Sequence, residues 1–176
     1  FVSNRIEQAL KSQFEARDKA TQLPRRQRAQ SMLYTAQHNS KALRRVAPFI
    51  SANRAEGRLP QQVEIALAAF KAGVGVSANL SIGQFDSHAN NDRDQMRLIP
   101  EFLSGIDALL RKAEDLQIRE KLVVVIQSEM GRKPLYNKGN GKDHWSIGSV
   151  MFLGAGIKGN RVIGATDEGQ FLVPVD

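Results

Sequence analysis

The residues best suited to chemistry lie in FDSHANN, residues 85–91. This stretch contains Asp86 and His88, and the whole chain of 176 residues has only three histidines. In extended backbone, residues two positions apart point to the same side, so this carboxylate and this imidazole are able to face one ion together. The spacing therefore indicates a site that binds a metal ion or handles protons.

Two later clusters offer similar groups. SEMGR contributes Glu129 and Arg132, and GNGKDHW contributes Asp143 and His144. Mixed oxygen and nitrogen ligands favour zinc or manganese, with magnesium and calcium as the alternatives. The chain has no cysteine, which excludes thiolate ligands, cysteine nucleophiles and disulfides. The predicted metal ligands are Asp86, His88, Glu129, Asp143 and His144.

Each cluster also has a simpler interpretation. A histidine beside an aspartate is common in turns that hold no ion, and Glu129 is equally suited to a helix cap or an ion pair. Arg132 is predicted to stabilise an anion, because guanidinium matches the oxygens of phosphate or sulfate, but it also suits a surface charge. The conjunction of the three clusters, rather than any one of them, indicates a shared site.

The pattern of apolar residues predicts the elements that position these clusters. Strands are expected at residues 73–82, 121–128 and 146–156, and an amphipathic helix at residues 92–117. The almost wholly apolar KLVVVIQS is typical of a central parallel strand that is buried on both faces. Strand, helix and strand form a βαβ unit, in which ligands bind beyond the carboxyl ends of the strands. The sequence thus predicts an α/β layer whose edge gathers the three clusters.

The chain before this layer is predicted to be helical. Apolar residues recur at helical spacing in residues 3–20 and 25–48, and PQQVEIALAAFKAG begins with proline and ends with glycine, as helices often do. This predicts a helical leader over residues 1–59 and an α/β core over residues 60–176 that is incomplete at both ends. The first residue, Phe1, and the apolar ending FLVPVD predict a piece of a longer protein.

The positive charge is concentrated in the leader. Residues 1–60 contain twelve Lys/Arg and four Asp/Glu, a net charge of +8, whereas the remaining residues carry a net charge of −1. A basic segment suits a nucleic acid or a membrane surface, but it equally suits solvated helices. The leader has no recognisable DNA-binding motif, so solvated helices are favoured over a nucleic-acid partner. No apolar run approaches the roughly 20 residues that a membrane span needs.

Four motifs together resemble a known family. FDSHANN, LVVVIQSEMGRKPLYN, GKDHW and GAGIKGNRVIGATDEG occur in the same order in a large bacterial family of exported proteins, filed as domain of unknown function 1501 and related to the alkaline phosphatase and sulfatase superfamily. The resemblance spans residues 73–176 and is looser in the leader. Met130 replaces the usual phenylalanine, and GAG replaces a glycine triplet.

This resemblance implies a three-layer α/β/α sandwich and metal-dependent hydrolysis of small phosphate or sulfate esters. It also implies a periplasmic or cell-surface location. Asp86 and His88 would match the pair on one ion, His144 the later histidine ligand, and Glu129 a carboxylate from the next strand end. Asp143 would be a ligand or a partner that orients an imidazole, and Arg132 has a family counterpart without an assigned role.

The rival hypothesis is a non-catalytic exported module with a structural metal site. In the superfamily, an earlier strand supplies a further aspartate ligand, and a helix start supplies the nucleophile. Neither has a matching position in this sequence. The same residues would then hold an ion that pins three loops together.

Overall fold

The chain forms two compact units, Phe1–Pro48 and Phe49–Asp176. A computed structural model describes residues 5, 8–13, 15–16, 24–53 and 55–174. In the first unit, the described residues of the predicted helix 3–20 are helical, and its other residues lie outside the described ranges. Helix α2, Pro24–Val46, confirms the second predicted helix and carries Arg44 and Arg45 in its last turn, where positive charge complements the helix dipole.

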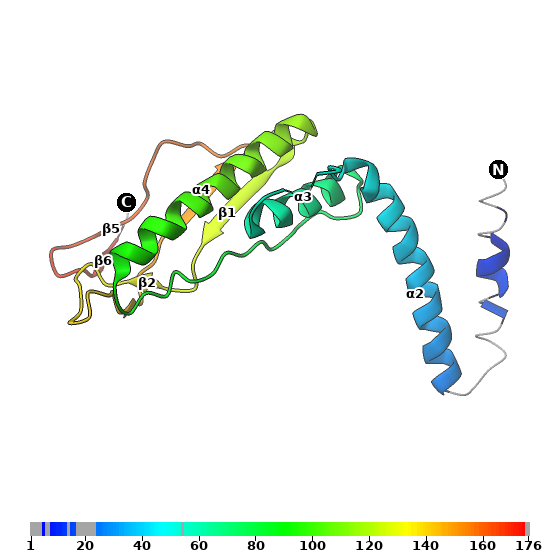
Figure 1. The fold of residues 1–176 in the computed structure, drawn as a ribbon, viewed down its shortest axis with the longest axis horizontal. Coiled ribbons are helices and arrows are strands. Elements are labelled where there is room, and N and C mark those ends of the chain that lie inside the picture. Colours follow the sequence, from blue (N-terminus) through cyan, green and yellow to red (C-terminus); the bar gives the residue numbers. More distant parts are fainter. Residues whose placement is uncertain (1–4, 6–7, 14, 17–23, 54, 175–176) are drawn as a thin grey trace. The chain divides into compact units, whose positions relative to one another are not determined.

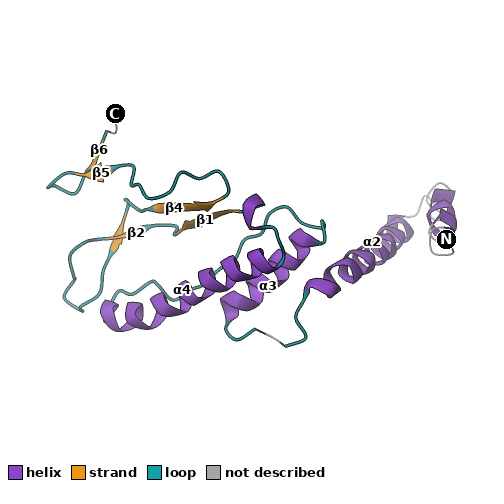
Figure 2. Cartoon of the chain, turned by 90° about the horizontal axis from the view of Figure 1, so that it is seen from above, coloured by secondary structure: helices purple, strands orange, loops and turns teal. Residues whose placement is uncertain are grey.

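Two long helices dominate the second unit (Figures 1 and 2). Helix α3, Arg58–Lys71, and helix α4, Asn91–Asp115, confirm the two helices predicted there. Short 3₁₀ helices, η1 at Ala47–Phe49 and η2 at Arg119–Lys121, follow α2 and α4. Among the described residues, no helix combines the length and the apolar character that crossing a membrane requires.

In the part of the chain that the structure describes, the strands pair into three small antiparallel sheets. Strand β1, Val123–Gln127, confirms the strand predicted around residues 121–128, and it runs alongside α4 in Figure 1. The three pairs are β1 with β4 (Val150–Gly154), β2 (Gly131–Arg132) with β3 (His144–Trp145), and β5 (Ala165–Thr166) with β6 (Leu172–Val173).

The predicted strand at residues 73–82 is wrong. The segment begins with a turn and bends at residues 73–76, has no regular structure at residues 77–82 and pairs with no described strand, and its Val76 is 99 % exposed. The side chain of Gln62 in α3 takes the place of a neighbouring strand, because it donates to Ser81 O at 2.9 Å and accepts from Ser81 N at 3.0 Å. The βαβ unit is therefore wrong as well. The structure mixes helices with antiparallel sheets, which agrees with an α/β class only in the general sense, and it does not show the three-layer sandwich.

The core of the second unit lies between α3 and α4. Val63 and Leu67 of α3 meet Leu109 and Ala113 of α4, and Val124 of β1 packs against this cluster. Neighbouring residues of β1 point to opposite faces of the sheet, so Val123 and Val125 on the other face are about half exposed. The prediction of a central strand buried on both faces is wrong, since the helices cover one face only.

A buried carboxylate links α3 and α4 to the loop before them. Glu64, 9 % exposed, accepts a hydrogen bond from Ser51 N at 2.7 Å, and Lys112 Nζ of α4 lies 3.7 Å from it. Hydrogen bonds from Ser51, and to a lesser extent the charge of Lys112, lower the pKa of Glu64 below its ordinary value of 4.5. The ionised form of Glu64 is therefore favoured in the folded state.

This pKa shift predicts that the free energy of unfolding differs between the wild-type chain and Glu64→Gln by an amount that depends on pH. A carboxyl group whose pKa is lower in the folded than in the unfolded state stabilises the fold. This contribution is fully present above pH 4.5 and is lost as the pH falls through the folded-state pKa. Urea unfolding at several pH values between 7 and 3 measures the difference. The wild-type advantage in free energy of unfolding should shrink as the solution is acidified, and a constant advantage would contradict the assignment.

Candidate metal centre

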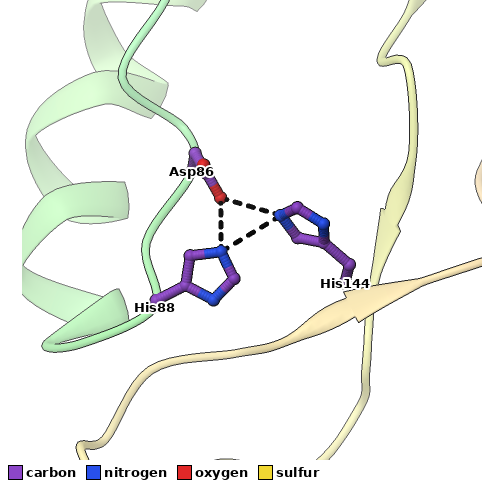
Figure 3. Close-up of side chains that lie close together, drawn as sticks. All are labelled: Asp86, His88 and His144. Atoms are coloured by element: carbon purple, nitrogen blue, oxygen red, sulfur yellow. Dashed lines mark hydrogen bonds and ion pairs between the residues drawn. The ribbon is translucent and has the colours of Figure 1, made fainter.

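Three of the predicted ligands converge on one point (Figure 3). Asp86 Oδ1 lies 3.0 Å from His88 Nε2 and 3.1 Å from His144 Nε2, and the two Nε2 atoms are 3.1 Å apart. The three atoms thus form a nearly equilateral triangle. In the described residues, this is the one group of three or more His, Cys, Asp and Glu side chains with the spacing of a metal site.

The size of the triangle fits an ion. Nitrogen and carboxylate ligands lie about 2.1 Å from zinc, which separates neighbouring ligand atoms by about 3.0 Å in octahedral and about 3.4 Å in tetrahedral coordination. The edges of 3.0 and 3.1 Å match the face of an octahedron and are shorter than those of a tetrahedron. One divalent ion is therefore able to bind all three atoms without a change in their spacing.

Hydrogen bonding alone does not explain the triangle. If both Nε2 atoms of His88 and His144 carry protons, both bond to Asp86, but the two N–H groups oppose each other across 3.1 Å. If only one Nε2 carries a proton, the lone pair of the other faces the carboxylate oxygen. No single protonation state makes all three contacts favourable, whereas a cation above the plane of the triangle accepts all three lone pairs.

The loop that carries Asp86 and His88 is anchored to the start of α4. The intervening Ser87 is 3 % exposed, and its hydroxyl donates to Asn91 Oδ1 at 2.8 Å and accepts from Gln95 Nε2 at 3.2 Å. The side chains flanking this serine therefore project on the exposed side of the loop, where both are more than half exposed.

The segment before His144 lies alongside this loop. Gly141 is buried against the backbone carbonyl of His88, and a Cβ at this glycine would overlap that carbonyl group. The contact holds the two histidine-bearing segments side by side. Three backbone hydrogen bonds join these segments: Asn90 N to Gly139 O (3.1 Å), Asn91 N to Asn140 O (2.8 Å) and Lys142 N to Ser87 O (3.0 Å).

The β2–β3 hairpin places a cation beside the triad. Arg132 is the cross-strand partner of His144, and its side chain is 21 % exposed. It donates to Asp86 Oδ1 and, at 2.8 Å, to Lys142 O. The hydrogen bond from Arg132, with a smaller contribution from His144, lowers the pKa of Asp86 to about 2. Asp86 is therefore an anion at any pH at which an imidazole is neutral and able to bind metal.

Asp143 lies on the opposite side of the His88 ring from the triad. Its Oδ1 is 3.8 Å from His88 Nδ1, and a hydrogen bond from Asn137 is the main cause that lowers its pKa. A carboxylate in this position favours the proton on Nδ1 and leaves the Nε2 lone pair for an ion. Of the two roles considered for Asp143, this geometry suits the partner that orients an imidazole.

Glu129 is not part of the triad. It is exposed in the connection between β1 and β2, and its role as a ligand stays a prediction. Asn137, whose side chain holds the second loop, is not among the predicted site residues. Its signal was NKGNG, because asparagine followed at short distance by glycine is typical of turns in which the side chain accepts backbone hydrogen bonds.

One family model matches the chain. It is described as a protein of unknown function, DUF1501, and it matches residues 2–173. The matched range contains every residue of the candidate centre and also most of the predicted helical leader, in which the resemblance was looser. No curated protein and no solved structure matches the chain.

Proposed function

We propose that this chain, which belongs to the DUF1501 family of proteins of unknown function, binds one divalent ion through Asp86, His88 and His144 and hydrolyses phosphate or sulfate esters. The observation that carries the proposal is the triangle of one carboxylate oxygen and two imidazole nitrogens, with edges of 3.0 to 3.1 Å. The nitrogen and oxygen ligands favour zinc or manganese, with magnesium or calcium as alternatives.

The openness of the centre supports a reactive ion. The three side chains are between 47 and 64 % exposed, and structural zinc sites usually have four protein ligands and are closed to solvent. Three protein ligands leave coordination positions for water and for a substrate oxygen. A bound ion would polarise the ester and lower the pKa of a bound water.

Arg132 suits the binding of an anionic ester. A guanidinium has five N–H donors, and the bonds to Asp86 and to Lys142 O engage one on each terminal nitrogen. The remaining donors are available to the non-bridging oxygens of a phosphate or sulfate group. In this proposal, Arg132 keeps Asp86 ionised and also contributes to holding the substrate.

The alternative is an ion that only pins loops together. Such an ion adds little here, because three backbone hydrogen bonds and the close approach of Gly141 already hold the two histidine-bearing segments side by side. The catalytic proposal is therefore placed first. The resemblance to exported proteins also leads us to propose a periplasmic or cell-surface location.

Metal loading followed by an assay tests the proposal. The chain is stripped with a chelator, incubated separately with zinc, manganese, magnesium or calcium, desalted and analysed by elemental mass spectrometry. About one zinc or manganese ion per chain, together with metal-dependent hydrolysis of an aryl phosphate or aryl sulfate, is expected. Retention of metal without hydrolysis would favour the structural alternative, and failure to retain any metal would overturn the site itself.

A further inference from the structure

We infer that Asn137 is a positioning residue for the metal centre, which acts by holding His88 and its partner Asp143 in one arrangement. The inference rests on the proposed function, because it concerns the same ion. Asn137 belongs to none of the clusters that the chemistry of the sequence singled out, and it contributes no atom to the triad.

The side-chain amide of Asn137 makes four hydrogen bonds, which is its full capacity. Its Oδ1 accepts from two backbone amides, Gly139 N at 2.9 Å and Gly141 N at 3.0 Å. Its Nδ2 donates to His88 O at 3.0 Å and to Asp143 Oδ1 at 2.9 Å. One half-buried amide thus joins the turn, the backbone of one ligand and the carboxylate that faces that ligand.

The network also defines the orientation of the amide. A flipped amide would direct its NH₂ group at two N–H donors and its oxygen at a carbonyl and a carboxylate, so all four contacts would become repulsive. A donor is therefore required on the side that faces His88 and Asp143. Serine and aspartate are unable to supply two such donors, and asparagine is the smallest side chain that does.

The consequence for the centre concerns the His88 ring. Asn137 donates to the backbone oxygen of His88, which fixes the backbone that carries the ring. It also donates to Asp143, whose Oδ1 lies 3.8 Å from His88 Nδ1. Both effects direct Nε2 toward Asp86 and His144. Outer partners of metal-binding histidines commonly change metal affinity by about 10- to 100-fold when they are replaced.

A matched pair of variants tests this role. Asn137→Asp keeps the size of the side chain and an acceptor for the glycine amides, but it replaces the donor with an oxygen. Asn140→Asp adds the same charge to the same loop at an exposed residue whose backbone φ of 54° aspartate tolerates. Zinc affinity of the full chain, measured by competition with a chromophoric chelator, should fall about 10- to 100-fold in Asn137→Asp and less than about threefold in Asn140→Asp.

A double-variant cycle separates positioning from general damage to the loop. In a His88→Ala background, where zinc binding is already weak, adding Asn137→Asp should change the remaining affinity less than about threefold, because the imidazole that Asn137 orients is gone. An equally large loss in both backgrounds would overturn the positioning role. Wild-type affinity in Asn137→Asp would overturn it too, while leaving the proposed ion site intact.

Hydrogen exchange at backbone amides tests whether the two histidine-bearing segments stay paired in the variant. The Asn91 and Lys142 amides, which bond across the two segments, should stay protected in Asn137→Asp. If that protection is lost, Asn137→Ser is used instead. The serine hydroxyl accepts a hydrogen bond from Gly139 N, as is typical of such turns, but it does not donate to both His88 O and Asp143 Oδ1. Asn137→Ser should show the same loss of zinc affinity, and unchanged affinity in this variant would overturn the inference. Failure of the wild-type chain to bind any of the four ions would instead refute the proposed function.

Discussion

Replacing His144 by alanine should lower zinc affinity by more than about 100-fold, and His88→Ala should have an effect of the same order. Loss of an outer partner of a metal ligand reduces affinity by about 10- to 100-fold, and loss of a ligand itself removes one of only three protein atoms on the ion. Both imidazoles are about half exposed, so alanine leaves no cavity in the core. The fold should therefore persist while the site is lost.

Elemental mass spectrometry and chelator competition on each variant measure this effect. Asp107→Asn is the matched control, because Asp107 is an exposed carboxylate of α4 that pairs with Arg111 and lies outside the triad. Glu129→Gln decides the remaining predicted ligand: unchanged affinity places Glu129 outside the site, and a loss comparable to that of His144→Ala makes it a fourth ligand. Wild-type zinc binding in the His88→Ala/His144→Ala double variant would refute the triad.

Gly141→Ala should disrupt the contact between the two histidine-bearing segments. A Cβ at this buried position would overlap the backbone C and O atoms of His88 and the N of Ala89, which move only if the whole loop moves. Overpacking of this kind commonly destabilises a protein by about 1 to 3 kcal/mol. Because the displaced carbonyl belongs to a ligand residue, zinc affinity should fall at least about tenfold as well.

Gly139→Ala is the matched control, since it lies in the same turn and its Cβ would meet its nearest neighbour, Asn137 Oδ1, at 3.4 Å. Gly139→Ala should leave the free energy of unfolding and the zinc affinity close to those of the wild-type chain. Hydrogen exchange at Asn91 and Lys142, together with chelator competition, measures the two variants. Equal behaviour of both alanine variants would show that the close approach at Gly141 does not maintain the centre.

The elements that were predicted well are those whose signals are local. The regular spacing of apolar residues and the terminal proline and glycine of α3 were sufficient to predict it, because a helix satisfies its backbone hydrogen bonds within one segment. A strand satisfies them only through a partner elsewhere in the chain. Residues 73–82 have the composition of a strand, yet the side chain of Gln62 bonds to Ser81, and no described strand pairs with the segment.

The same distinction between local and long-range signals applies to the candidate metal centre. The sequence by itself determined which chemistry is available: carboxylates, two histidines beside carboxylates, one arginine and no thiol. Only the tertiary structure decided that Asp86, His88 and His144 share one point, that Asp143 faces the far nitrogen of a ring, and that Asn137 connects them. The physical reason is that residue types are local properties of a chain, whereas a metal site depends on distances between loops that only the pairing of their backbones sets.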